Sequence, residues 1–436
     1  MKSSKSRRRA ELNKPRGGGF SLFANEPRSW AISRGATIFI LSAIFALGCF
    51  LRLRHMGDVA SRSPDETLYT SEAKRIDEGR PIESPTMKRK LPYLFVVTAA
   101  MKITGMKDER AGSWVSCVAS IVSLLVIGAV GVRFLSPWAA IYAMAFTAVS
   151  PLCLMSSRRC WQESIVECLG LILVWSIGEI TLNGRWWGYA GLFLAGVACV
   201  TIKQHAIFLL TGALLYVFGW LIYRRAWRPL MYFGGASLLM AVAAAAAIGY
   251  SMGGANQLVS LWRHAYVDVP AGPQASWAVI NQSGPWYEFV YGLWVLAPLT
   301  AGFSLTAVAL VAVPARTRLR PAMRASERFL VPFLAYTITV MILALLIMPL
   351  SQNLRYLAPV YGALNILGGI GFAGLVNTAL CFRPMFAYPL AAAAAALVLI
   401  NLNASYGDSE LLVQVKAQDL AIKHVLALPA ARALSM

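Results

Sequence analysis

Residues 111–132 read AGSWVSCVASIVSLLVIGAVGV, an apolar stretch that contains no charged residue. A helix needs about 20 predominantly apolar residues to cross the hydrocarbon core of a bilayer. Similar apolar runs lie on both sides of this one along the chain, separated by short polar joints. We therefore predict an all-α membrane protein, a polytopic helical bundle.

We expect eleven membrane-spanning helices, at about 36–53, 111–132, 137–156, 163–182, 186–202, 204–223, 230–250, 287–313, 328–350, 355–378 and 384–402. Residues 91–104 are apolar too, but this run is too short to cross and contains Lys102. We interpret it as a re-entrant or interfacial helix, one of the amphipathic juxtamembrane helices of the first outer loop.

The composition excludes several classes of protein. Of the 436 residues, 58% are hydrophobic and 14% charged, against about 45–50% and about 25% in soluble domains. A soluble enzyme, a disordered chain and a disulfide-rich secreted domain are therefore excluded. The net charge of +20 could indicate nucleic-acid binding, but the basic residues lie in the joints between apolar runs, where the positive-inside rule explains them.

The positive-inside rule also predicts the topology. With a cytosolic N-terminus and no crossing at 91–104, the cytosolic joints contain most of the arginines, namely Arg133, Arg185, Arg224, Arg225, Arg228, Arg316, Arg318, Arg320, Arg324 and Arg328. Residues 54–90, 251–286 and the tail from 403 then lie outside. If 91–104 crossed, the arginine clusters would face outward, against the rule.

Residues 62–69 read RSPDETLY and admit two interpretations. Ser63 as N-cap with Glu66 three residues later forms a capping box, and Asp65 favours the positive end of the helix dipole. The alternative is catalytic, because two adjacent carboxylates at the membrane surface could provide a general base. Lys90, at the end of a basic triplet just before an apolar segment, suits a lipid phosphate.

Six segments, in order, resemble the motifs of GT-C glycosyltransferases of the protein O-mannosyltransferase and aminoarabinose transferase type. They are Asp65-Glu66-x-x-Tyr69, Lys90-Leu91-Pro92-Tyr93, Ser150-Pro151 followed by Arg158 or Arg159 and Glu163, the stretch 196–203 ending in Lys203, Gly284-Pro285-Trp286-Tyr287, and Arg355-Tyr356-x-x-Pro359. Three residues depart from the family pattern, since Leu91 replaces a proline, Glu163 the commoner aspartate and Gln204 a glycine.

The resemblance implies transfer of a sugar from a polyprenyl-phosphate donor to a lipid, polysaccharide or protein acceptor, with inversion at C1. We expect no cofactor and no metal, because the sequence has no His-x-x-x-His or similar spacing and no G-x-x-x-x-G-K-S/T motif. Asp65 would be the general base, and Glu66 and Glu163 would position the acceptor or the sugar hydroxyls. The departing phosphate would be neutralised by Lys90, Lys203 and Arg355. The substrate loops would contain Tyr69, Arg158, Arg159, Trp286, Tyr287 and Tyr356.

The residue pattern and this resemblance together suggest a domain division and a location. Residues 1–35 would be a disordered basic cytosolic tail, 36–402 the GT-C transmembrane catalytic domain, and 403–436 a short tail on the outer face. The aromatic outer loop 251–286 would be a flexible cover for the donor, although an aromatic belt at the headgroups explains its composition equally. We expect a bacterial inner membrane with the active site facing the periplasm.

Two other functions stay open at this point. A multi-span transporter or lipid flippase would need no covalent chemistry, but it predicts internal repeats and charges buried mid-membrane, and Glu167 is the main candidate for such a charge. A non-catalytic scaffold would tolerate loss of every charge on the outer face. The transferase hypothesis instead predicts that these ionisable residues converge at one face, and each could otherwise be a snorkelling side chain.

Overall fold

The structure is a computed structural model, and it describes residues 32–54, 64–88, 90–254, 297–312, 323–347 and 354–382, with a few single residues besides. Within these residues every regular element is helical, which confirms the predicted all-α membrane fold. The predicted tails 1–35 and 403–436, most of the loop 251–286 and most of the last predicted span lie outside the described residues.

Seven of the described helices are long and apolar enough to cross a membrane. They are α2 (Arg34–Leu53), α6 (Glu109–Phe134), α9 (Glu163–Asn183), α11 (Ala206–Tyr223), α12 (Trp227–Met252), α18 (Ala325–Ile347) and α19 (Ala358–Phe382). Two further apolar helices, α10 (Trp187–Ile202) and α17 (Pro298–Ala312), are shorter. The predicted number of eleven spans stays a prediction.

The expected span 137–156 is broken in the structure. It consists of α7 (Pro137–Val149) and α8 (Pro151–Ser157), which meet at an angle of 50°. The break falls at Pro151, whose ring removes a backbone donor from the helix. Ser150 caps α8 by accepting a hydrogen bond from the Cys153 amide at 3.4 Å. The joint therefore has a local, sequence-encoded cause.

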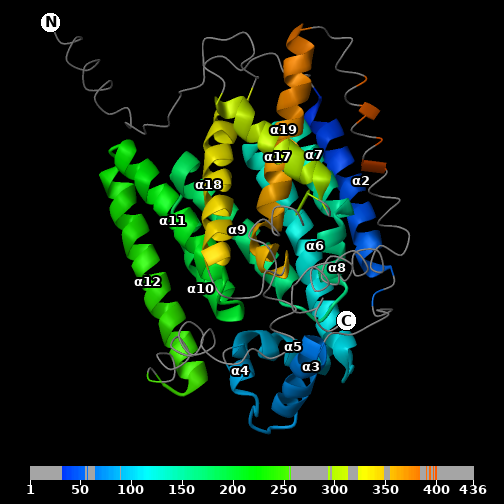
Figure 1. The fold of residues 1–436 in the computed structure, drawn as a ribbon, viewed down its shortest axis with the longest axis vertical. Helices are drawn as coiled ribbons and strands as arrows, with labels where there is room; N and C mark the ends of the chain where they lie inside the picture. The colour runs from blue at the N-terminus through cyan, green and yellow to red at the C-terminus, as the bar shows by residue number, and fades with distance from the viewer. Residues whose placement is uncertain are drawn as a thin grey trace, which may run out of the picture.

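The bundle is closely packed around α19. A Cβ atom added at Gly371 of α19 would lie 1.8 Å from the carbonyl oxygen of Phe303 in α17. Backbones that approach this closely are typical of membrane helix interfaces built on small residues. Figure 1 shows α17 beside α19, with α12 at the edge of the bundle.

Three helices form a separate group at one end of the bundle, which we call the cap (residues 64–104). They are α3 (Pro64–Asp77), α4 (Pro85–Lys88) and α5 (Leu91–Thr104), and Figure 1 shows them below the bundle. The hydroxyl of Thr98 in α5 donates to the Ala73 carbonyl of α3 at 3.0 Å. The short helix at 91–104 thus lies beside α3, as expected of a juxtamembrane helix.

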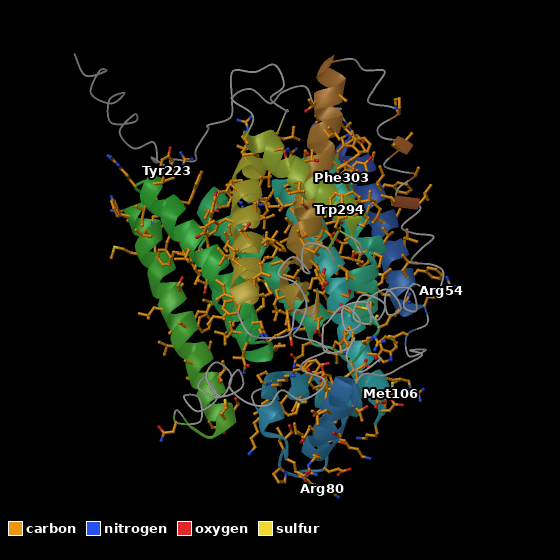
Figure 2. All side chains as sticks on the ribbon, in the orientation of Figure 1. Arg54, Arg80, Met106, Tyr223, Trp294 and Phe303 are labelled. Carbon is orange, nitrogen blue, oxygen red and sulfur yellow. The ribbon has the colours of Figure 1, made fainter. Side chains whose placement is uncertain are left out.

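The cap and the end of α11 lie at opposite ends of the bundle. In Figure 2, Tyr223 lies at one end of the molecule, and Arg80 and Met106 lie at the opposite end, in and near the cap. Because Tyr223 ends α11, the arginine cluster that follows it begins at the end remote from the cap. Residues 54–90 and this cluster were predicted to lie on opposite sides.

Candidate active site

The candidate residues come from the ends of several elements at the cap end of the bundle. Asp65 and Glu66 lie in the first turn of α3 and Glu163 in the first turn of α9. Lys203 is the C-cap of α10. The loop between α8 and α9 and the short 3-10 helix η2 (Leu354–Leu357) complete the set. The contacts that follow show which of these residues meet.

Glu66 is completely buried, at 0% exposed surface. One carboxylate oxygen accepts a hydrogen bond from Arg159 Nη1 at 3.2 Å, and the other accepts one from the Cys160 amide at 3.1 Å. Both donors belong to the loop between α8 and α9. The carboxylate therefore ties the first turn of α3 to the bundle.

Asp65, the neighbouring residue, is partly exposed. Successive residues of a helix point about 100° apart, so the two carboxylates of this turn face different surroundings. Asp65 and Glu66 are adjacent in the sequence, but they differ in burial and so can have different roles. Asp65 is the one whose carboxylate a substrate could reach.

Lys90 and Tyr69 lie on the same side of the cap. The Lys90 ammonium donates to the Tyr69 hydroxyl at 2.7 Å and lies 4.6 Å from the centre of the same ring. The Tyr69 ring in turn packs edge-on against Tyr93, with 5.1 Å between ring centres. Lys90 is partly exposed and opens α5 as its N-cap.

Lys203 and Glu163 form a buried ion pair. The ammonium lies 2.7 Å from the Glu163 carboxylate, and both side chains are less than a tenth exposed. Lys203 also lies 5.4 Å from the centre of the Tyr356 ring, on which His205 stacks at 4.6 Å. This group joins the ends of α9, α10 and η2.

The two predicted arginines point to different partners. Arg158 donates to the Leu51 carbonyl near the end of α2 at 2.8 Å. Arg159 binds Glu66 and lies 4.8 Å from the Trp161 ring. Both side chains are buried within the protein, so neither is the snorkelling side chain that the sequence allowed.

Some predicted residues cannot be placed in this arrangement. Trp286 and Tyr287 lie outside the described residues, and of Arg355 the structure describes the backbone, within η2. Within the described part of the chain, no group of three or more His, Cys, Asp or Glu side chains could hold a metal ion.

Cys160 belongs to the site but was not singled out in the sequence. Its thiol lies 3.5 Å from the Tyr93 hydroxyl and 4.0 Å from the Thr70 hydroxyl, both in the cap. Burial raises the pKa of this thiol to about 11. It therefore stays protonated at neutral pH and packs as a small neutral group. No spacing pattern marks it, because its partners are distant in sequence.

Arg52 is a second residue that the sequence did not single out. It is fully buried in the bundle, where its guanidinium donates to Ser120 Oγ at 2.7 Å and to the Thr147 carbonyl at 3.1 Å. Glu167, in the same bundle, accepts a hydrogen bond from Cys153 Sγ at 3.2 Å. These groups lie within the helices and contact none of the candidate site residues through the bonds described here.

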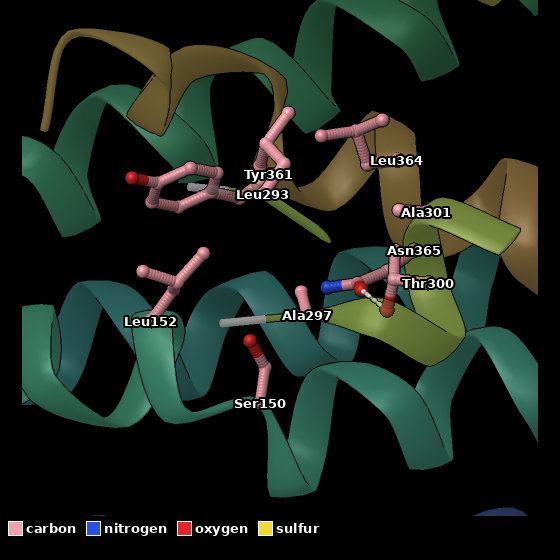
Figure 3. A pocket seen from close by; sticks show the side chains of 9 residues that line it. All are labelled: Ser150, Leu152, Leu293, Ala297, Thr300, Ala301, Tyr361, Leu364 and Asn365. Carbon is pink, nitrogen blue, oxygen red and sulfur yellow. Dashed lines mark hydrogen bonds between the residues drawn. The ribbon is translucent and has the colours of Figure 1, made fainter. Parts of the chain in front are cut away.

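A cavity lies beside the break between α7 and α8. Figure 3 shows Ser150, Leu152, Tyr361 and Asn365 around it. Asn365 Oδ1 accepts a hydrogen bond from the Thr300 hydroxyl at 3.1 Å. The lining is mostly apolar and comes from Ser150 at the break, from α8, α17 and α19, and from Leu293 and Ala297 just before α17. None of it comes from the cap, so this cavity is separate from the candidate site.

Two comparisons with known proteins bear on this geometry. Residues 91–248 match the family model described as dolichyl-phosphate-mannose-protein mannosyltransferase. The structure is similar to that of ArnT from Cupriavidus metallidurans in the apo state, with a TM-score of 0.56 and 15% sequence identity, over 90% of this chain and 76% of that one. The chain has the GT-C fold.

The structure of ArnT from Cupriavidus metallidurans bound to undecaprenyl phosphate gives a TM-score of 0.54 at 15% identity, over 91% of this chain and 77% of that one. A comparison with curated proteins finds no match. The family match and the GT-C fold together indicate a glycosyltransferase, as the sequence resemblance predicted. The apolar helices and this fold also make the chain an integral membrane protein.

Proposed function

We propose that this chain transfers a sugar from a polyprenyl-phosphate donor to an acceptor at the cap end of the bundle. The observation that carries the proposal is the collection of carboxylates and ammonium groups at that end, in a GT-C fold. A similar structure, ArnT from Cupriavidus metallidurans, has been obtained with undecaprenyl phosphate bound, which favours a polyprenyl carrier here.

Asp65 is the proposed general base. An acceptor hydroxyl or amine attacks C1 of the sugar, its proton passes to the Asp65 carboxylate, and the bond between C1 and the phosphate oxygen breaks. The electron pair of that bond leaves with the polyprenyl phosphate. A single displacement of this kind inverts C1. Partial exposure of Asp65 supports this role, since a base must reach the proton that it removes.

Lys90, Lys203 and Arg355 are the proposed partners of the departing phosphate. An ammonium group has three donors. Lys203 can therefore contact a phosphate oxygen while it keeps its bond to Glu163. Glu163 would then orient the ammonium and position a sugar or acceptor hydroxyl. Preorganised charge of this kind acts most strongly where water is excluded, and both side chains are buried.

The substrate loops are proposed to contain Tyr69, Arg158, Arg159 and Tyr356, together with Trp286 and Tyr287. The acceptor is a lipid, a polysaccharide or a protein. We place the cap on the periplasmic face of a bacterial inner membrane. The arginine cluster after α11 supports this orientation, because it begins at the end remote from the cap.

The test is transfer of label from radiolabelled polyprenyl-phosphate sugars in membranes that contain wild type or Asp65→Asn. We expect a labelled product with wild type and none with the variant at equal expression. Asp77→Asn is the matched control, because Asp77 lies on the same helix and binds Lys107 at the cap surface. Full transfer by Asp65→Asn would refute the base. Flipping of the donor without a labelled product would favour the transporter hypothesis.

A further inference from the structure

Helix α3 contains two buried glutamates with different partners. Glu72 is 4% exposed and accepts hydrogen bonds from the backbone amides of Glu83 and Ser84, at 3.2 and 2.9 Å, both within the cap. Glu66 accepts its bonds from Arg159 and Cys160, both in the bundle. Of these two carboxylates, Glu66 is the one that joins the cap to the bundle.

The ion pair between Glu66 and Arg159 is buried, so each charge depends on its partner for stabilisation. The guanidinium is 3% exposed and the carboxylate 1%. Arginine stays charged in proteins, so loss of the negative charge on Glu66 would leave a buried cation without this partner. Removing one member of a buried ion pair strongly destabilises the folded protein. The geometry of this turn is therefore held by charge as well as by shape.

Glu66 follows Asp65 directly in the first turn of α3. When the side chain of Glu66 is held by two donors, the backbone of the turn is held as well, and the direction of the Asp65 side chain is fixed. A misplacement of about 1 Å in a reacting group costs on the order of a hundredfold in rate. A contact made by Glu66 can thus govern the activity of its neighbour.

We propose that Glu66 is a positioning residue, which orients Asp65 by binding Arg159 and the Cys160 amide, and that it neither touches the substrate nor moves a proton. This inference rests on the proposed function, because it assigns Asp65 the role of base. It differs from the expectation from sequence, in which Glu66 positions the acceptor or a sugar hydroxyl itself.

The kinetic test compares Glu66→Gln, Arg159→Met and the double variant with wild type, in purified full-length protein with a saturable lipid-phosphate sugar donor. Glutamine keeps the shape and can still accept from the Cys160 amide, but it presents no charge to Arg159. Glu72→Gln is the matched control. It neutralises a buried carboxylate on the same helix whose partners lie inside the cap.

We expect Glu66→Gln to lower kcat by about ten- to a hundredfold, with the donor KM within about twofold of wild type. The acidic limb of the pH profile of kcat should persist, since Asp65 remains. The double variant should lose no more than the worse single variant, because both substitutions break one interaction. Glu72→Gln should keep kcat close to wild type.

Three kinetic outcomes would overturn the proposal. They are loss of the acidic limb in Glu66→Gln, a rise in KM with unchanged kcat, and an equal loss of kcat in Glu72→Gln. Amide hydrogen exchange gives a readout that does not depend on transfer, so it separates failure of this inference from failure of the proposed function. Glu66→Gln should speed exchange in residues 64–70 and at Cys160, and Glu72→Gln mainly at 83–84. Unchanged exchange at 64–70 in Glu66→Gln would refute the positioning role of Glu66.

Discussion

Gly112 of α6 is the point where a single added methyl group should disturb the candidate site most directly. A Cβ atom at this position would lie 2.0 Å from Cys160 Sγ and 2.8 Å from Cys160 Cβ. Carbon and sulfur atoms in contact are ordinarily about 3.5–4.0 Å apart. Cys160 must therefore adjust if alanine is introduced, with a shift of more than 1 Å at its Sγ atom and a smaller one at its Cβ atom. Its backbone amide is the donor to Glu66, so the movement reaches the turn that contains Asp65.

The expected size of the effect follows from two opposing contributions. Overpacking a well-packed core costs about 1–3 kcal/mol, whereas replacing glycine by alanine inside a helix contributes about 0.5–1 kcal/mol of stability. The net change for Gly112→Ala is then a destabilisation of at most about 2.5 kcal/mol. Transfer activity should fall even where the protein remains folded, because the movement of Cys160 disturbs the hydrogen bond from its amide to Glu66.

Thermal unfolding and initial transfer rates in the same membrane mimetic measure the two effects. Gly128→Ala is the matched control on α6, since a Cβ atom there would lie 3.7 Å from Met144 Sδ, an ordinary contact. Adding Cys160→Gly to Gly112→Ala removes the two closest atoms and leaves the Cys160 Cα at 3.4 Å. The double variant should therefore recover activity relative to Gly112→Ala. Wild-type activity of Gly112→Ala, or no recovery in the double variant, would refute the reasoning.

Three further predictions concern other contacts. Lys203→Met or Glu163→Gln alone should destabilise the protein by about 3–5 kcal/mol, since each removes one member of a buried ion pair, and the two together should cost less than the sum of the single changes in a thermal unfolding series. The hydrogen bond from Lys107 lowers the pKa of the Asp77 carboxyl, so its stabilising effect is present above the unfolded pKa of about 3.9 and is lost as the pH falls through the lower folded value. The melting temperatures of wild type and Asp77→Asn should thus differ at pH 7 in low salt and approach each other as the pH is lowered below about 3.9, and a difference that does not change with pH would contradict the assignment. Gly371→Ala should unfold more easily than wild type, because the added Cβ meets the backbone of α17; an unchanged melting temperature would count against that packing.

Much of the fold could be predicted because membrane helices are encoded locally. A run such as 111–132 is long and apolar, and it became α6. The break between α7 and α8 was predictable in principle from Pro151. The span was instead identified by its mean hydropathy, which a single proline in an apolar run hardly changes. The short helix at 91–104 has the expected bounds, and its length remains the reason for predicting that it does not cross the membrane.

The partners of the site residues could not be predicted, because they are distant in sequence. Glu66 reads locally as the third residue of a capping box, yet its carboxylate binds Arg159 and the Cys160 amide. Lys203 and Glu163 were both identified as candidates, but the pattern gave no reason to pair them. Residue types at span ends indicate that charges gather, and only the packing of helices decides which charges meet.

The two ion pairs of the candidate site are more deeply buried than the ion pairs of Glu179 in the bundle, and this difference bears on function. At the end remote from the cap, Glu179 is buried, but its partners Arg133 and Arg185 are 39% and 51% exposed. At the cap end, the two pairs formed by candidate site residues, Glu66 with Arg159 and Glu163 with Lys203, have every side chain less than a tenth exposed, whereas the Lys107 side chain of the surface pair with Asp77 is 49% exposed.

Burying both members of an ion pair contributes little to stability compared with apolar residues of the same size. Two such pairs on the α8–α9 loop and α9, with a partly exposed aspartate next to one of them, are therefore poorly explained by folding alone. Fixed charges in a place sheltered from water do suit a reaction in which a phosphate departs with negative charge. The distribution of burial thus favours the cap end as the place of chemistry, independently of any sequence motif.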